Sequence, residues 1–162
     1  MTQITDMVNL EQRGEIAVLV IDNPPVNALS RGVRDGLCEG IERAEADPGV
    51  RATVIVCQGR TFIAGADIRE FSKPREGGNP TASIAAASKP LIAATHGTVL
   101  GGGLELAMAC HFRVGLASTR FGLPEVLLGI LPGGGGTQRL PRIVGVEKAL
   151  LMITSGDRIG AD

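Results

Sequence analysis

The amino-acid sequence predicts an α/β fold. Short runs of β-branched and other apolar residues recur along the chain, and segments with apolar side chains at helical spacing lie between them. Glycine and proline close most of these segments, so each has the length of a single strand or helix. Strands that alternate with helices favour an α/β architecture over an all-β one.

The first predicted elements are a strand, a helix and a second strand. The first strand covers residues 15–21 and ends in the turn of residues 22–25. Ser30 is expected to cap a helix that runs to the stop signal of residues 47–49. The apolar residues at helical spacing are Val33, Leu37, Ile41 and Ala44. The second strand covers residues 52–57.

A capping-box pattern, Asp67 to Glu70, predicts a short helix that starts after Asp67. Residues 72–80 are rich in Ser, Pro, Gly and charged side chains, which is typical of a loop. A helix of small residues is expected at 81–88, followed by a strand at 91–95.

A glycine triplet, 101–103, opens an apolar helix that extends to Cys110, and a strand follows at 112–116. Pro124 suits the first position of a helix, which places Glu125 in its first turn.

The last segment begins with a second glycine cluster at 133–136. Helices broken at Pro141 and Gly145 are expected after it, with the final helix at 146–155. The length predicts one domain, and we assign residues 1–162 to it.

The composition argues against nucleic-acid binding. The net charge is −1, so the chain lacks the positive charge that attracts phosphates. Four Phe and no Trp or Tyr leave few rings for base stacking. The hydrophobic fraction of 44% is ample for a globular core.

No metal site is expected. The cysteines, Cys38, Cys57 and Cys110, contain no CxxC pair, and buried reduced thiols are the expected state of Cys57 and Cys110. The only histidines, His96 and His111, add no metal-ligand spacing and are expected at strand edges or in core contacts.

A cytoplasmic location is the expectation from the sequence. The N-terminus lacks a basic region followed by an apolar stretch, so no signal peptide is visible. Gly, Pro or Glu interrupts the most apolar stretches, so no membrane span is expected either.

Two isolated carboxylates are the first chemical signal. Glu105 is the only charged residue between Gly97 and Cys110, and Glu125 is the only one between Phe121 and Gln138. Burial raises the pKa of a carboxyl group, and such a group suits proton transfer near neutral pH. Each Glu could instead lie on a solvent-facing helix surface or cap a neighbouring helix, and this pattern alone leaves both interpretations open.

The glycine triplet before Glu105 is the second signal. It leaves free N–H groups at a helix start, where a developing oxyanion can be held. A tight turn that needs positive φ is the alternative. The phosphate loop GxxxxGK[ST], a GxGxxG dinucleotide motif with its acidic partner and the hydrolase motif GxSxG are all absent.

These segments together resemble the enoyl-CoA hydratase/isomerase (crotonase) superfamily. The segments that match its signatures, in order, are Asn23–Leu29, Phe62–Phe71, Leu100–Ala107, Leu123–Gly133 and Gly136–Pro141. They run through nearly the whole chain, and jointly they are specific.

The resemblance implies a spiral of ββα units and an acyl-CoA thioester as substrate. The oxyanion hole would use the backbone N–H groups of Ala66 and Gly102. Glu105 would orient and deprotonate the attacking water, and Glu125 would exchange the proton at the substrate α-carbon.

Further substrate contacts follow from the same resemblance. The positions expected to bind the substrate are Ala64, Gly65, Asp67, Ile68, Gly101 and Gly133. CoA is part of the substrate, so no separate cofactor is expected. The implied reaction is hydration of a 2-trans-enoyl-CoA to a 3-hydroxyacyl-CoA in fatty-acid β-oxidation. Δ3,Δ2-Enoyl-CoA isomerisation and non-catalytic acyl-CoA binding are the alternatives.

Residues 109–114 and 125–133 look closest to the hydratase part of multifunctional β-oxidation enzymes. Full-length relatives of that kind continue into a 3-hydroxyacyl-CoA dehydrogenase, and the family forms homo-oligomers. Relatives also carry further C-terminal helices, which we expect to be missing from these 162 residues.

Overall fold

The computed structural model describes residues 2–72, 74 and 76–161. Within these residues the strands are β1 Thr2–Thr5, β2 Val8–Arg13, β3 Ile16–Ile21, β4 Ala52–Cys57, β5 Ile63–Ala64, β6 Leu91–Thr95, β7 Thr98–Leu100, β8 Phe112–Gly115, β9 Arg120–Gly122 and β10 Arg158–Ile159. The α-helices are α1 Arg31–Ala46, α2 Pro80–Ala86, α3 Gly102–Ala109, α4 Gly136–Val144 and α5 Val146–Ser155. Two short 3-10 helices are η1 Ile68–Glu70 and η2 Pro124–Leu128.

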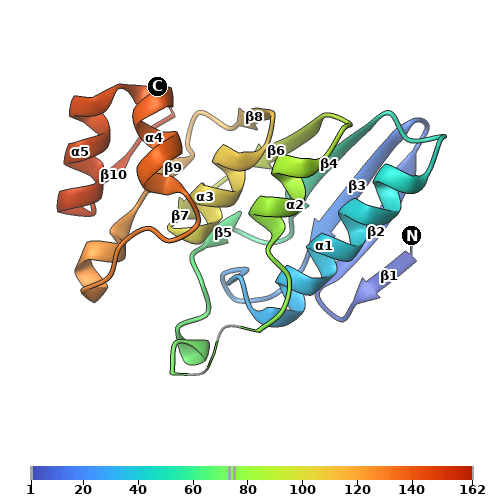
Figure 1. Ribbon diagram of the computed structural model, residues 1–162, viewed down its shortest axis with the longest axis horizontal. Coiled ribbons are helices and arrows are strands. Elements are labelled where there is room, and N and C mark those ends of the chain that lie inside the picture. Colours follow the sequence, from blue (N-terminus) through green and yellow to red (C-terminus); the bar gives the residue numbers. More distant parts are fainter. Residues whose placement is uncertain (1, 73, 75, 162) are drawn as a thin grey trace.

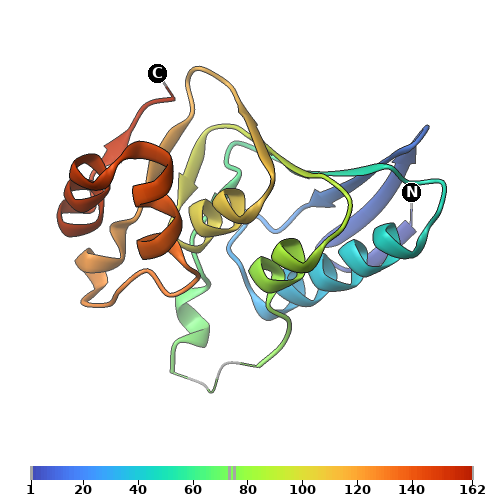
Figure 2. The ribbon, with the colours of Figure 1, turned by 45° about the horizontal axis from the view of Figure 1, so that its top comes forward.

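The strands form two sheets. The six-stranded sheet has the order β1-β2-β3-β4-β6-β8, and the four-stranded sheet has the order β10-β9-β7-β5. β1, β2 and β3 form an antiparallel meander, whereas β3, β4, β6 and β8 pair in parallel. Figures 1 and 2 show α1, α2 and α3 in a row on one side of the six-stranded sheet.

From β4 onward, the chain adds one strand to each sheet and then a helix. β4, β6 and β8 join the large sheet, and β5, β7 and β9 join the small one. The helical elements α2, α3 and η2 follow these strand pairs in turn. The predicted α/β class and the spiral of ββα units are therefore confirmed.

Fully buried apolar residues anchor each segment that carries a predicted site residue. Ile63 precedes the segment of Ala66, Leu106 follows Glu105, and Leu123 precedes Glu125, and all three have no exposed surface. They belong to one hydrophobic cluster that side chains from both sheets and from α1 to α5 share. Rigid elements that end in such a core hold the adjoining loops in place.

The sequence prediction overlooked six of the described strands. β5, β7, β9 and β10 are only two or three residues long, so they are too short to show an alternating pattern. β1 and β2 lie at the edge of the large sheet with polar residues on the exposed side, which weakens their apolar signal. The predicted helix at 81–88 runs instead from Pro80 to Ala86.

Two predicted helix signals were wrong. Ser30 occupies the N-cap position of α1, but its side chain makes no capping hydrogen bond and lies 3.3 Å from the Met7 sulfur. Pro141 does not break α4, which continues to Val144. A proline removes one N–H bond, and buried Leu140 beside it anchors this helix in the core. The predicted break at Gly145 is confirmed.

We predict that Gly103→Ala destabilises the fold. A Cβ at Gly103 would lie 2.3 Å from the backbone oxygen of Ile63, and backbone cannot move aside as a side chain can. The free energy of unfolding should fall by about 1–3 kcal/mol, measured by urea denaturation. The control is Gly32→Ala in α1, where the nearest atom is the flexible Met7 thioether at 3.3 Å. Equal stability of the two variants would contradict the prediction.

Candidate active site

Parallel pairing of β5 with β7 brings two glycine-rich turns together. Ile63 pairs with Val99, and Ala64 pairs with Leu100. Ala66 and Gly102 each lie two residues beyond the last of these pairs. A Cβ on Gly102 would lie 3.8 Å from the Ala66 nitrogen, so the two backbones approach closely.

The N–H groups of Ala66 and Gly102 remain available. Neither donates a hydrogen bond to another described residue. Gly102 is the first residue of α3, where helix geometry leaves the N–H without an intrahelical acceptor. Two unpaired donors beside a helix N-terminus can stabilise an oxyanion.

Gly101 connects this pair of donors to Glu125. Its φ of +50° is a conformation that glycine adopts without strain. A Cβ there would lie 3.0 Å from Glu125 Oε1 and 3.6 Å from the Gly65 Cα. The structure therefore brings Gly65, Gly101 and Glu125 together beside Ala66 and Gly102.

Glu125 is a nearly buried carboxyl group in η2, with 8% of its surface exposed. Its Oε2 is buried and has no hydrogen-bond partner among the described residues. Burial raises the pKa of Glu125, its own backbone N–H partly offsets the rise, and the negative charge of Glu105 adds to it. A carboxyl group with a raised pKa and a free oxygen can both hold and transfer a proton.

Glu105 lies in the first turn of α3, with 4% of its surface exposed. Its Oε1 accepts hydrogen bonds from the Gly134 and Gly136 N–H groups, each at 2.7 Å. These two bonds fix the carboxylate and hold the second glycine cluster against α3. A Cβ on Gly134 would lie 2.8 Å from Glu105 Oε2, so a larger residue there would displace the carboxylate.

Neither carboxylate lies on a solvent-facing surface of its helix, which was one of the alternatives that the sequence left open. Glu105 does contribute to structure, because it satisfies two backbone donors of the glycine loop. Glu125 has a buried oxygen that no described residue pairs with, and its pKa is raised. Perturbed and incompletely paired carboxyl groups of this kind are more frequent at functional sites than elsewhere.

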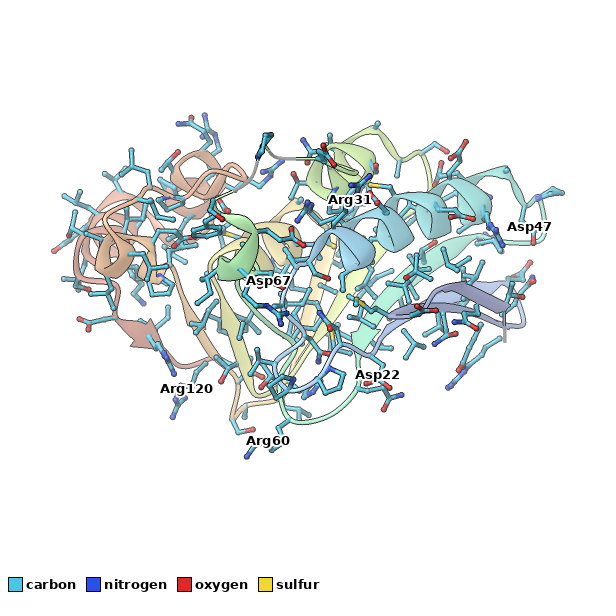
Figure 3. All side chains as sticks on the ribbon, turned by 90° about the horizontal axis from the view of Figure 1, so that it is seen from below. Asp22, Arg31, Asp47, Arg60, Asp67 and Arg120 are labelled. Carbon is cyan, nitrogen blue, oxygen red and sulfur yellow. The ribbon has the colours of Figure 1, made fainter. Side chains whose placement is uncertain are left out.

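The other predicted substrate-binding residues differ in their hydrogen bonds and in their exposure. Ala64 ends β5, and the Gly65 carbonyl accepts a bond from Leu29 N, so these residues are held in place. The Asp67 carboxylate is engaged by the Arg69 backbone and guanidinium, and the hydrogen bond from Arg69 lowers its pKa. Ile68 is 67% exposed beside it. Figure 3 labels Asp67 at η1 and Arg31 on α1.

Gly133 belongs to the second glycine cluster. It lines a hollow of about 300 Å³ between α2 and the second glycine cluster, together with Gly134 and Arg139. A second hollow, of about 590 Å³, lies at α4 and α5. Neither of these two hollows is lined by Ala66, Gly102 or Glu125.

Sequence reasoning missed Leu29, Arg34 and the tertiary role of Glu70. Leu29 forms an isolated bridge with Ala66, and its side chain lies over Gly102. Asp67 caps η1 as the pattern predicted, but Glu70 bonds to Arg31 and Arg34 of α1 rather than back to Asp67. A sequence motif carries no sign of a partner 36 to 39 residues away.

Arg139, His96 and His111 have structural contacts. Arg139 is half-buried and donates to the Gly134 carbonyl at 2.9 Å. His111 accepts from Leu91 N, and the His96 ring contacts the Gly59 carbonyl. Residues 2–72, 74 and 76–161 contain no His, Cys, Asp and Glu cluster suited to a metal ion. They also contain no helix long and apolar enough to cross a membrane.

Comparison with known proteins identifies the class to which this fold and site belong. The chain belongs to the enoyl-CoA hydratase/isomerase family, whose model matches residues 11–162. It is 49% identical over 156 residues to a probable enoyl-CoA hydratase from Bacillus subtilis (strain 168), an alignment that covers 89% of this chain and 60% of that protein.

Two further relatives extend this result. The chain is 49% identical over 149 residues to the peroxisomal bifunctional enzyme of Danio rerio, covering 90% of this chain and 21% of that protein. A solved structure of an enoyl-CoA hydratase subunit from Geobacillus kaustophilus HTA426 superimposes with a TM-score of 0.90 at 36% identity, covering 98% of this chain and 65% of that one. The chain therefore spans less than two thirds of each of these relatives.

We predict that Glu125→Gln stabilises the fold at neutral pH. The pKa of Glu125 is higher in the folded chain than in the unfolded chain, so ionising this carboxyl group lowers the free energy of unfolding. The loss begins as pH rises past the pKa of the unfolded chain and is complete above the pKa of the folded chain. The variant should exceed the parent by about 1 kcal/mol near pH 7 in urea denaturation, since a neutral amide replaces the buried charge. The difference should vanish below about pH 4, where both side chains are neutral.

Glu147→Gln provides the matched control for this experiment, because Glu147 is exposed in α5. Its effect on stability should be small, because the side chain is exposed. A parent that is more stable than the Glu125→Gln variant at neutral pH would show that Glu125 is favourably paired when ionised.

Proposed function

We propose that this chain provides the hydration site for 2-trans-enoyl-CoA thioesters, which are converted to 3-hydroxyacyl-CoA in fatty-acid β-oxidation. The observation that carries the proposal is the juxtaposition of two unpaired N–H donors, Ala66 and Gly102, with the buried carboxyl of Glu125. Hydration of a conjugated thioester requires both kinds of group.

The oxyanion hole would act on the thioester oxygen. Addition of water to the β-carbon moves electron density through the α-carbon onto that oxygen, so it gains enolate character. The N–H groups of Ala66 and Gly102 would donate to it, and each such donor contributes about 10²- to 10³-fold in rate. Because the backbone holds both donors, little reorganisation is needed during the reaction.

The two carboxyl groups would divide the proton transfers. Glu105 would orient the attacking water and remove its proton, since two backbone N–H bonds fix the direction of this carboxylate. Glu125 would deliver a proton to the α-carbon, for which its raised pKa and unpaired Oε2 suit it. Together the steps add a hydroxyl group to the β-carbon and a hydrogen to the α-carbon.

Substrate binding would use the backbone of the β5–η1 segment. We assign the CoA moiety to the neighbourhood of Ala64, Gly65, Asp67 and Ile68, with Gly101 beside the thioester and Gly133 further along the substrate. CoA belongs to the substrate, and we propose no separate cofactor. Cytoplasmic location stays a prediction.

A homo-oligomer is part of this proposal. Large apolar side chains are exposed along η2 and α5, and contiguous exposed apolar surface is typical of protein interfaces. The exposed residues concerned are Val126, Leu127, Leu128, Ile130, Leu131, Val146, Leu150 and Leu151. A dehydrogenase partner domain belongs to the proposal only as a feature of full-length relatives of the bifunctional kind.

Δ3,Δ2-Enoyl-CoA isomerisation is the second candidate. It requires one group that moves a proton between two carbons, and the free oxygen of Glu125 offers such a group. Hydration is favoured because a second carboxylate, Glu105, is fixed nearby. Isomerisation would leave this carboxylate without a role in proton transfer.

The test follows the loss of the 2-enoyl thioester absorbance of crotonyl-CoA. Parent turnover should fall by about 10²- to 10⁴-fold in both Glu105→Gln and Glu125→Gln, since each removes a proton-transfer group. The control variant Glu147→Gln should retain the parent rate.

Parent turnover that survives both substitutions would contradict the assigned roles. A folded parent that binds CoA thioesters without turning them over would contradict the proposal that this chain alone is catalytic and would favour the acyl-CoA-binding alternative. Turnover of a 3-enoyl-CoA that depends on Glu125 but not on Glu105 would favour isomerisation.

A further inference from the structure

A buried arginine connects three segments of the chain, two of which adjoin the candidate oxyanion hole. Arg34 of α1 is only 9% exposed. Its guanidinium donates to the Leu29 carbonyl at 3.0 Å, to Glu70 Oε2 at 2.9 Å and to the Glu76 carbonyl at 2.6 Å. One planar side chain thus ties the residues before α1 to the residues after Ala66.

Glu70 completes the connection from the other side. Its Oε1 accepts the Arg31 N–H at 2.8 Å, which supplies the N-terminal cap that Ser30 does not provide. The carboxylate also lies at the positive end of the α1 dipole. Partial burial opposes its ionisation, but the hydrogen bonds from Arg31 and Arg34 outweigh burial and lower the pKa of Glu70.

Arg34 and Glu70 are both linked to the segment around Ala66. Leu29, whose carbonyl Arg34 holds, donates its own N–H to the Gly65 carbonyl at 2.9 Å and bridges Ala66. The Leu29 Cδ1 would lie 3.2 Å from a Cβ on Gly102, so the same residue contacts both halves of the donor pair. Glu70 is four residues after Ala66, at the end of η1. Ala66 is therefore fixed on its upstream side through Leu29 and on its downstream side through Glu70.

The Arg34 Nε is buried without a partner among the described residues. An apolar pair of similar volume often gives equal or greater stability than a buried ion pair. The contribution of the Arg34–Glu70 pair is therefore better sought in the geometry that it imposes.

We propose that Arg34 and Glu70 are positioning residues that hold the Ala66 N–H in line with the Gly102 N–H. The proposal rests on the proposed function, because it concerns the same oxyanion hole. Neither side chain touches the substrate. Their effect is on the alignment of a donor that acts most strongly in the transition state, so their loss should lower kcat rather than CoA binding.

The experiment compares Glu70→Gln, Arg34→Lys and the double variant with the parent. Glu70→Gln retains an oxygen for Arg31 N but removes the charge that faces Arg34. Arg34→Lys retains a charge but cannot span three acceptors as the guanidinium does. Each should lower kcat for crotonyl-CoA by about 10- to 100-fold, as expected for a small misplacement of a catalytic donor. The double variant should be no slower than the single ones, since the pair acts as a unit.

A binding measurement separates positioning from general loosening. An S-alkyl CoA thioether lacks the thioester carbonyl and does not need the oxyanion hole, so its dissociation constant should be unchanged in these variants. The enolate absorbance of bound acetoacetyl-CoA should decrease in step with kcat. Glu39→Gln and Arg43→Lys, which alter an exposed ion pair on the same helix, provide matched controls and should resemble the parent.

Each outcome is decisive. Unchanged kcat in Glu70→Gln, or thioether binding that weakens as much as kcat falls, would overturn the positioning role. Thermal unfolding identifies variants that have lost the fold, and Glu70→Gln, whose side chain is partly exposed, is the milder substitution. A parent that neither turns over crotonyl-CoA nor forms the bound enolate would mean that the proposed function itself fails. That result is distinct from failure of the variants alone.

Discussion

The short parallel pairing between β5 and β7 is the interaction on which the site depends. Only two residue pairs form it, Ile63 with Val99 and Ala64 with Leu100, but their register determines which residues meet where the strands end. It places Ala66 close to Gly102, with Gly65 and Gly101 beside Glu125. A shift of one residue would move every one of these contacts. Ile63 and Val99 are fully buried, so the core opposes such a shift.

Electrostatic asymmetry gives the two carboxyl groups different properties. Glu105 meets two backbone N–H donors from the second glycine cluster, which orient it firmly. Glu125 has a buried oxygen without a partner in the described part of the chain, and the charge of Glu105 adds to the effect of burial on its pKa. Two carboxyl groups whose surroundings differ in this way can take different parts in one proton-transfer reaction. The glycines matter because side chains at Gly101 and Gly134 would collide with these carboxylates.

The sequence alone predicted the α/β class and the main helices because their apolar patterns are strong. It also indicated Glu105 and Glu125, since isolated charges in apolar segments are conspicuous. Short strands such as β7 and β9 carry no periodic signal, although they determine the register of the site. The pairing of Ala66 with Gly102 came from family resemblance rather than from spacing. Glu70 was read as a local cap, because its contacts with Arg31 and Arg34 arise only in the folded chain.

The central claim is that the Ala66 and Gly102 amides together receive the thioester oxygen. The most direct measurement is a titration of ¹⁵N-labelled protein with acetoacetyl-CoA and, separately, with an S-alkyl CoA thioether. The account predicts that the Ala66 and Gly102 amide proton signals move downfield with acetoacetyl-CoA and stay near their free positions with the thioether, because only the former presents an oxygen to both donors. Equal shifts with the two ligands, or binding of acetoacetyl-CoA that leaves both amides unmoved, would contradict it.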